Sequence, residues 1–77
     1  MIVYSQTTCA PCNSLKQYLK RKNISFIERN ISEDPEHTAT LLKHTGGQLL
    51  VPTVVVNNQV IVGLNWSAIS KAVNTHG

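Results

Sequence analysis

Two cysteines, Cys9 and Cys12, lie close together near the start of the chain and are its only cysteines. They follow a short β-type run, Ile2–Ser5, and begin a helical pattern that continues through Leu15 and Leu19. A thiolate at a helix N-terminus is stabilised by the free N–H groups and the positive end of the helix dipole. We therefore expect a strand, a tight connection and a helix, with both sulfurs at the start of the helix.

Four kinds of chemistry use a Cys-x-x-Cys pair. A tetrahedral zinc site needs two more ligands, and two turns of helix would hold His37 and His44 about 10 Å apart, too far to share one ion. Haem attachment needs histidine after the second cysteine, where this chain has Asn13. A structural disulfide closing so short a loop contributes only about 2 kcal/mol. Redox exchange remains, and no metal site is expected.

The two sulfurs have different expected roles in that exchange. Cys9 stands at the outer edge of the helix start and should be the attacking thiolate. Cys12 lies one turn further in, on the apolar face with Leu15, and should resolve the mixed disulfide.

The remaining pattern predicts an α/β protein with the element order β-α-β-α-β-β-α. Pro11 fits the first turn of the first helix, Asp34-Pro35 starts the second, and Asn57-Asn58 marks a hairpin turn. The short first crossover favours a parallel strand pair in a four-stranded mixed sheet flanked by helices. The expected strands are 2–5, 24–29, 51–56 and 59–62, and the expected helices are about 9–22, 35 to Gly46-Gly47, and 66 to at least 73.

Length and composition limit the expected number of domains, the cellular location and the kinds of partner. The 77 residues are expected to form one domain, 1–77, and to be monomeric. No apolar run approaches the roughly 20 residues that span a bilayer, and no signal-type segment opens the chain, so a cytoplasmic location without membrane contact is expected. The net charge is +3. Its cluster at 16–22 lacks interleaved aromatic residues, so nucleic-acid binding is not expected.

Three motifs together resemble the glutaredoxin-like branch of the thioredoxin superfamily. Ser5-Gln6-Thr7-Thr8-Cys9-Ala10-Pro11-Cys12 looks like the glutaredoxin opening, Val51-Pro52 stands where the family has a cis-proline, and Val60-Ile61-Val62-Gly63-Leu64 matches its last strand and glycine turn. The resemblance runs from about residue 2 to residue 73. It implies a thioredoxin-like fold and a redox-active disulfide between the catalytic residues Cys9 and Cys12. The implied substrate-binding residues are Gln6, Thr8, Ala10, Pro11, Val51 (through its backbone), Pro52, Gly63 and Leu64.

The implied activity is reduction of protein disulfides or mixed disulfides, with thioredoxin reductase or glutathione as electron donor and no bound cofactor. Glutathione-using relatives often have Lys where this chain has Gln6, Pro-Tyr where it has Ala10-Pro11, and a second glycine and an acid after Gly63. The groups that grip glutathione are therefore mostly missing. Small redoxins that serve ribonucleotide reductase lack them too, which makes that enzyme a candidate partner, although their usual aromatic-Arg-Pro turn is replaced by Leu64-Asn65-Trp66.

The alternative function is a non-catalytic metal carrier. The segment 8–12 is superficially similar to the cysteine loop of small copper chaperones, and the fold could also bridge an iron–sulfur cluster in a dimer through Cys9. Copper chaperones have the order β-α-β-β-α-β, so the element order separates the two classes. Two aromatic residues complete the expectations. Tyr4 should lie in or at the edge of the core. Trp66 could belong to a partner-binding surface near Gly63, but its helical spacing favours packing with Ile69 and Val73.

Overall fold

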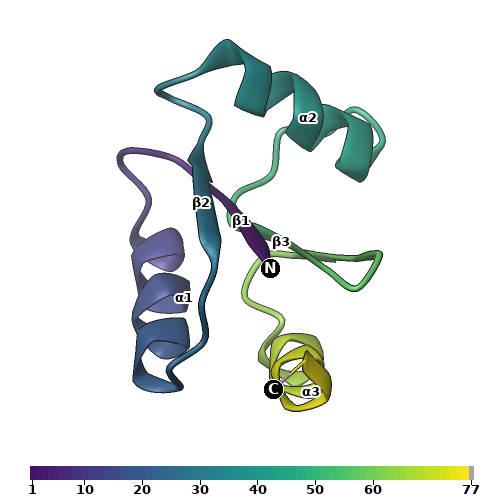
Figure 1. Ribbon diagram of the computed structural model, residues 1–77. Helices are drawn as coiled ribbons and strands as arrows, with labels where there is room; N and C mark the ends of the chain where they lie inside the picture. The colour runs from purple at the N-terminus through teal and green to yellow at the C-terminus, as the bar shows by residue number, and fades with distance from the viewer. Residues whose placement is uncertain (77) are drawn as a thin grey trace.

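The computed structural model describes residues 1–76, and its element order is the predicted β-α-β-α-β-β-α (Figure 1). The alternation of helices and strands that the sequence predicted is therefore confirmed. The elements are β1 (Ile2–Ser5), α1 (Ala10–Arg21), β2 (Ile27–Asn30), α2 (Pro35–Thr45), β3 (Thr53–Val56), β4 (Gln59–Val62) and α3 (Trp66–His76).

The four strands form one mixed sheet in the order β2-β1-β3-β4. β1 and β2 are parallel, as the short crossover predicted, and the other two pairs are antiparallel. Val3 of β1 lies opposite Glu28 of β2 and Val54 of β3. The central strand β1 leads directly into the cysteine segment, so the site starts from the most enclosed part of the sheet.

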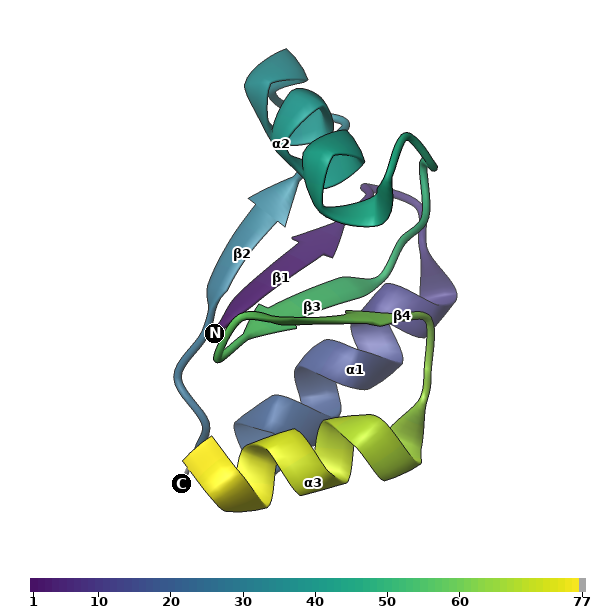
Figure 2. The ribbon, with the colours of Figure 1, turned by 90° about the vertical axis from the view of Figure 1, so that its right-hand side faces the viewer.

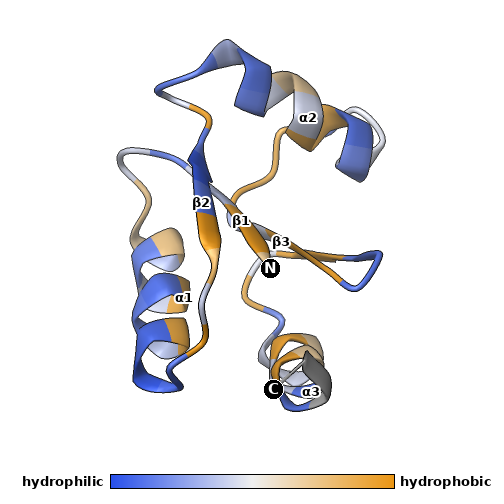
Figure 3. Cartoon of the chain, viewed as in Figure 1, coloured by the Kyte–Doolittle hydropathy of each residue, from blue (hydrophilic) through white to orange (hydrophobic). Residues whose placement is uncertain are grey.

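The helices cover the two faces of the sheet separately. Figure 2 shows α1 and α3 on one side and α2 on the other. Buried side chains of α1 and α3 form one cluster with Val3 and Val54, whereas Tyr4, the next residue of β1, faces α2 with its ring 6.0 Å from that of His44. Figure 3 shows that the apolar side of α1 faces the sheet and that its polar side faces outward.

Local sequence signals account for the helix and turn boundaries. Asp34 caps α2 by accepting a hydrogen bond from the Glu36 N–H at 2.9 Å, with Pro35 at the first helical position. Asn57 and Asn58 both adopt left-handed backbone conformations in the β3–β4 turn, with φ values of 49° and 63°. A two-residue turn with positive φ at both positions matches the twist of a hairpin, as the sequence predicted.

The second strand begins later than predicted. It covers Ile27–Asn30 rather than residues 24–29. The Ile24 N–H donates to the Leu19 carbonyl at 2.9 Å and so closes the end of α1, and Ile24 and Phe26 pack against the core from an irregular connection. The apolar run at 24–27 therefore reflects core packing as well as a strand. The third strand is shorter too, since Val51 and Pro52 form a bend before Thr53.

The two aromatic predictions have different outcomes. Tyr4 is fully buried, as expected. Trp66 does not join the buried face of Ile69 and Val73: it is 40% exposed, and its ring lies 5.0 Å from that of Tyr18. Trp66 is the first residue of α3, and the ring that it contacts there, Tyr18, belongs to α1. Helical spacing alone did not distinguish these two neighbours.

Candidate functional site

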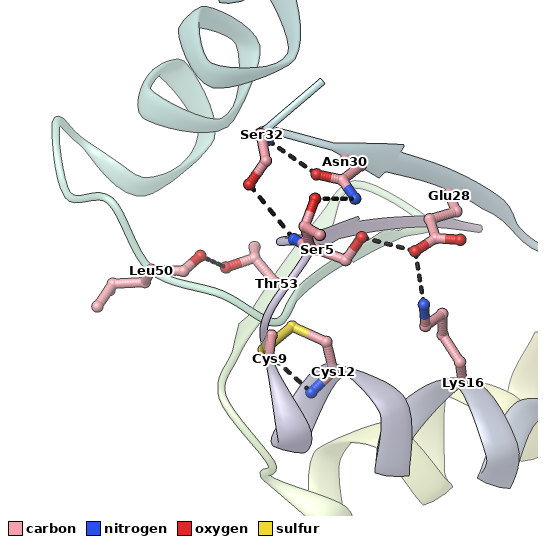
Figure 4. Close-up of a disulfide and its surroundings, with 10 residues drawn as sticks. Ser5, Cys9, Cys12, Lys16, Glu28, Asn30, Ser32, Leu50 and Thr53 are labelled. Atoms are coloured by element: carbon pink, nitrogen blue, oxygen red, sulfur yellow. Dashed lines mark hydrogen bonds and ion pairs between the residues drawn. A yellow bond between two sulfur atoms is a disulfide. The ribbon is translucent and has the colours of Figure 1, made fainter. Parts of the chain in front are cut away.

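The two cysteines form a disulfide at the start of α1 (Figure 4), with their Cα atoms 5.2 Å apart. Cys9 is the N-cap residue and has an extended backbone, and the Cys12 N–H donates a hydrogen bond to Cys9 Sγ at 3.2 Å. Cys9 thus takes the place usually held by a serine or aspartate side chain. A sulfur at this position receives an N–H dipole directly and the helix dipole in addition, which favours its thiolate form.

Burial separates the two sulfur-bearing residues. Cys12 is fully buried, whereas Cys9 is half-buried and the intervening Ala10 and Pro11 are exposed. An incoming molecule can therefore approach Cys9 from the side of Ala10 and Pro11. Cys12 is not open to solvent, so an incoming molecule does not contact it directly.

The Val51–Pro52 peptide bond is cis, as the resemblance implied. Pro52 is buried and Val51 is half-buried, and the Gly63 N–H donates to the Pro52 carbonyl at 2.8 Å. Thr53 follows Pro52, is fully buried, and closes the bend by donating its hydroxyl to the Leu50 carbonyl at 2.7 Å. Figure 4 shows Thr53 in the surroundings of the disulfide.

The structure thus joins two of the predicted site segments, residues 51–52 and 63–64, by a backbone hydrogen bond. Gly63 has φ of 74°, a conformation that favours glycine, and Leu64 packs against the core. The Gly63 position therefore links the start of α3 to the cis-proline segment.

The loop between β1 and α1 is held by side chains that no sequence motif indicates. The Thr7 N–H donates to Ser32 Oγ, and Asn30 Nδ2 donates to Thr7 Oγ1, both at 3.3 Å. The Ser32 N–H closes the group by donating to Asn30 Oδ1 at 2.8 Å. The predicted residues Gln6 and Thr8 flank this anchored position and are exposed. No spacing rule pairs Thr7 with residues more than twenty positions away, so only the parallel pairing of β1 with β2 reveals the group.

A second polar group lies beside the site. Glu28 Oε2 accepts hydrogen bonds from Lys16 Nζ and from the hydroxyl of fully buried Ser5, each at 2.7 Å. The hydrogen bond from Lys16, followed by that from Ser5, lowers the pKa of Glu28 below its usual value. Lys16 stands one turn beyond Cys12, so much of its charge is already balanced by the carboxylate of Glu28.

Metal binding has no obvious centre in the part of the chain that the structure describes. Among the residues whose side chains the structure describes, 1–74, no three or more His, Cys, Asp or Glu side chains gather where they could hold an ion. His37 instead lies 3.8 Å from the Asp34 carboxylate. Over the same residues, none of the helices combines the length and apolar character of a transmembrane span.

A comparison with models of protein families shows to which family the chain belongs. The Glutaredoxin model matches residues 1–61, which include both cysteines and the cis-proline. The chain belongs to the glutaredoxin family. Family membership together with the Cys9–Cys12 pair makes it a redox protein and, in general terms, a thiol oxidoreductase.

Individual glutaredoxin relatives match most of the chain. An uncharacterized glutaredoxin-like 8.6 kDa protein in the rubredoxin operon of Clostridium pasteurianum is 36% identical over 74 residues, covering 92% of this chain and 93% of that protein. The glutaredoxin-like protein NrdH of Lactococcus lactis subsp. cremoris is 29% identical over 69 residues, covering 90% of this chain and 93% of that protein. Both are close to this glutaredoxin in length.

Solved structures confirm the thioredoxin-like fold. The crystal structure of the thioredoxin-like protein BC3987 superimposes with a TM-score of 0.85 at 28% identity, covering 92% of this chain and 96% of that one. The glutaredoxin from Archaeoglobus fulgidus gives a TM-score of 0.82 at 22% identity, covering 94% of this chain and 83% of that one, which supports the fold alone.

Proposed function

We propose that this glutaredoxin is a dithiol electron carrier that reduces protein disulfides or mixed disulfides. One observation carries the proposal: the N-cap residue Cys9 is half-buried, whereas Cys12 is fully buried and donates its backbone N–H to the Cys9 sulfur. In this arrangement Cys9 can reach a substrate disulfide, whereas Cys12 can reach only Cys9.

The proposed reaction transfers two electrons in two exchanges. The Cys9 thiolate attacks one sulfur of the partner disulfide, so that a Cys9–partner bond forms and the other partner sulfur leaves as a thiolate. Cys12 then loses its proton and attacks Cys9 Sγ, which forms the Cys9–Cys12 disulfide and releases the second partner thiolate. The partner is reduced by two electrons and the protein is oxidised by two, which is the disulfide state seen in this structure.

The segments around the pair supply the proposed contacts to substrate. Val51 is half-buried beside the cis bond and is proposed to pair its backbone with an extended substrate, as in strand addition. Pro52 is buried and is proposed to act by positioning Val51. The remaining proposed contacts are the exposed or half-buried residues Gln6, Thr8, Ala10, Pro11, Gly63 and Leu64.

The proposed reductant is thioredoxin reductase or, as co-substrate, glutathione. None of the proposed contact residues is charged, and Lys16 is held by Glu28. Glutathione carries several charges, so an uncharged contact surface favours a protein disulfide as substrate and thioredoxin reductase as donor. Ribonucleotide reductase is one candidate disulfide partner on the same grounds.

Two substitutions test the division of labour between the cysteines. Cys9→Ser should abolish exchange, whereas Cys12→Ser should still form mixed disulfides but fail to release them. The measurement is NADPH consumption with a protein disulfide, coupled either to thioredoxin reductase or to glutathione and glutathione reductase, with mass spectrometry for the trapped adduct. Lys43→Ala, an exposed change on α2, is the matched control and should retain wild-type turnover. Full turnover by Cys12→Ser would contradict the proposed roles.

A further inference from the structure

An open groove of about 430 Å³ lies between α1 and α3, outside the cysteine site itself. Its floor and walls combine two aromatic rings with an arginine, an amide and two hydroxyls. The lining residues are Ser14, Gln17, Tyr18, Arg21, Trp66 and Ser70. The groove therefore offers apolar contact in the middle and a positive charge at one end.

Two aromatic rings in contact form the apolar part of the groove. The rings of Tyr18 and Trp66 come from different helices and lie 5.0 Å apart at an angle of 56°. Trp66 is still 40% exposed after this contact, which leaves apolar ring surface facing the groove. Large aromatic side chains with partial exposure are typical anchors of interaction surfaces.

The groove continues directly from the cysteine site. Pro11, Ser14 and Tyr18 follow one another at spacings of three and four residues, so they lie on one face of α1. The other wall also starts at the site, because Trp66 comes two residues after Leu64 and three after Gly63, which is bonded to Pro52. Figure 2 shows α1 and α3 starting at the same edge of the molecule and running at an angle to each other, and the Tyr18 and Trp66 rings join the two helices. A chain bound across Pro11 can therefore extend into the groove.

The charge on both walls has one sign. Neither α1 nor α3 contains an acidic residue, and the four acids of the chain all fall between positions 28 and 36. Lys16 is paired with Glu28, and Lys22 lies over the Tyr18 ring with Nζ 5.9 Å from its centroid. Within residues 1–76, no carboxylate pairs with Arg21, so its guanidinium is available at the far end of the groove.

We propose that this groove binds an acidic, extended segment of the protein that presents the disulfide, on one side of its reactive cysteine. The inference rests on the proposed disulfide reductase function and names the chemistry of the substrate. An apolar side chain of the segment contacts Tyr18 and Trp66, and a carboxylate pairs with Arg21. Cys9 and Arg21 are twelve residues apart, about 18 Å along a helix at about 1.5 Å per residue. An extended chain covers that distance in about five residues, so the acid should stand about five residues from the attacked cysteine.

Synthetic peptides test the proposal with the reduced full-length protein. Each peptide contains one cysteine as a mixed disulfide with thionitrobenzoate, a leucine three residues away, and either Glu or Lys five residues away. One set places these residues after the cysteine and a second set places them before it. Release of thionitrobenzoate gives the second-order rate, and the Glu-to-Lys rate ratio is compared between variants, so that any general loss of activity cancels.

The wild-type protein should prefer the Glu peptide by about five- to tenfold in one of the two sets at low salt, and the preference should weaken in 0.5 M salt. Arg21→Gln should bring the ratio close to one, and Arg21→Glu should invert it. Lys43→Glu makes the same charge reversal on α2 and should leave the ratio unchanged. Trp66→Ala should slow the leucine peptides but not matched glycine peptides.

Two results would overturn the groove proposal: a ratio near one in both sets, or an equal effect of Lys43→Glu and Arg21→Glu. Reduction of bis(2-hydroxyethyl) disulfide by the wild-type protein separates this failure from a failure of the proposed function. If the small disulfide is reduced while the peptides show no preference, only the groove proposal is wrong. If neither the small disulfide nor any peptide is reduced, the reductase function itself is wrong.

Discussion

The two faces of the sheet are covered to different extents. On the face of α1 and α3, both helices contribute fully buried side chains, and the sheet contributes Val3 and Val54 to the same cluster. On the other face, Leu41 is the buried residue that α2 contributes, and Tyr4 is fully buried nearby. We call the α1 and α3 side the closed face and the α2 side the open face. The buried cluster of the closed face consists of Leu15, Leu19, Val3, Val54, Val56, Ile61, Ile69, Ala72 and Val73.

Strand register shows which part of the sheet α2 does not cover. Ile27, Ile2, Val55 and Val60 are register partners in turn across all four strands. Alternation places them opposite the closed core, and Ile27 and Val60 are 60% and 39% exposed. A single helix about 10–12 Å across is narrower than four strands spaced about 4.8 Å apart, so α2 alone does not cover the whole sheet. The comparison suggests that stability is concentrated beneath the same helices that build the cysteine site and the groove.

The largest expected effect is on the closed face. Leu19→Ala should lower the free energy of unfolding by about 2–5 kcal/mol, because Leu19 is fully buried and a cavity would remain. Urea unfolding followed by circular dichroism measures the change. A loss below about 1 kcal/mol would show that the faces do not differ as described.

An intermediate effect is expected in the buried part of the α2 face. Tyr4 is fully buried, and its hydroxyl accepts a hydrogen bond from Arg29 at 3.2 Å. Tyr4→Phe should cost about 0.5–1.5 kcal/mol because this bond is lost while the ring packing is kept. The same urea titration applies, and Tyr4→Leu, which also removes the ring contact with His44, should cost more.

A smaller, pH-dependent effect is expected at Glu28. Its pKa is lowered in the folded protein by Lys16 and Ser5. The stabilisation is therefore fully present above the unfolded-state value near 4.5 and is lost as pH falls through the lower folded value. Because the Glu28 side chain is 36% exposed, Glu28→Gln should cost only about 0.5 kcal/mol at pH 7.

The stability difference between wild type and Glu28→Gln, measured by urea unfolding from pH 7 to pH 3, should therefore shrink below about pH 4.5. A difference that grows as the pH falls would contradict this assignment. Lys16→Gln should also reduce the pH dependence, because it removes the main cause of the lowered pKa.

The smallest expected effect is on the open face. Ile27→Thr should change the free energy of unfolding by less than about 0.5 kcal/mol, since Ile27 is 60% exposed and threonine also suits a strand. A loss above 1 kcal/mol, dependent on protein concentration, would show that another molecule covers this face.

Sequence patterns predicted the elements well but not every neighbour. Asp34, Gly46 and the Asn57-Asn58 turn mark their boundaries through local backbone chemistry, and the structure confirms each. The start of β2 was placed too early because Ile24 and Phe26 are apolar for packing and not for strand pairing. Trp66 was assigned to the core because spacing along one helix does not show which neighbouring helix it faces.

The sequence by itself determined the cysteine pair, its place at a helix start and the element order, because each depends on residues close together in the chain. The cis-proline position was implied by the resemblance to the glutaredoxin-like branch. The tertiary structure decided which of those parts meet. It placed Glu28 on Ser5 and Lys16, anchored Thr7 to Ser32, and set Trp66 against Tyr18 to form the groove. These contacts join residues far apart in the chain, and their geometry follows from sheet register and helix packing, which no local pattern records.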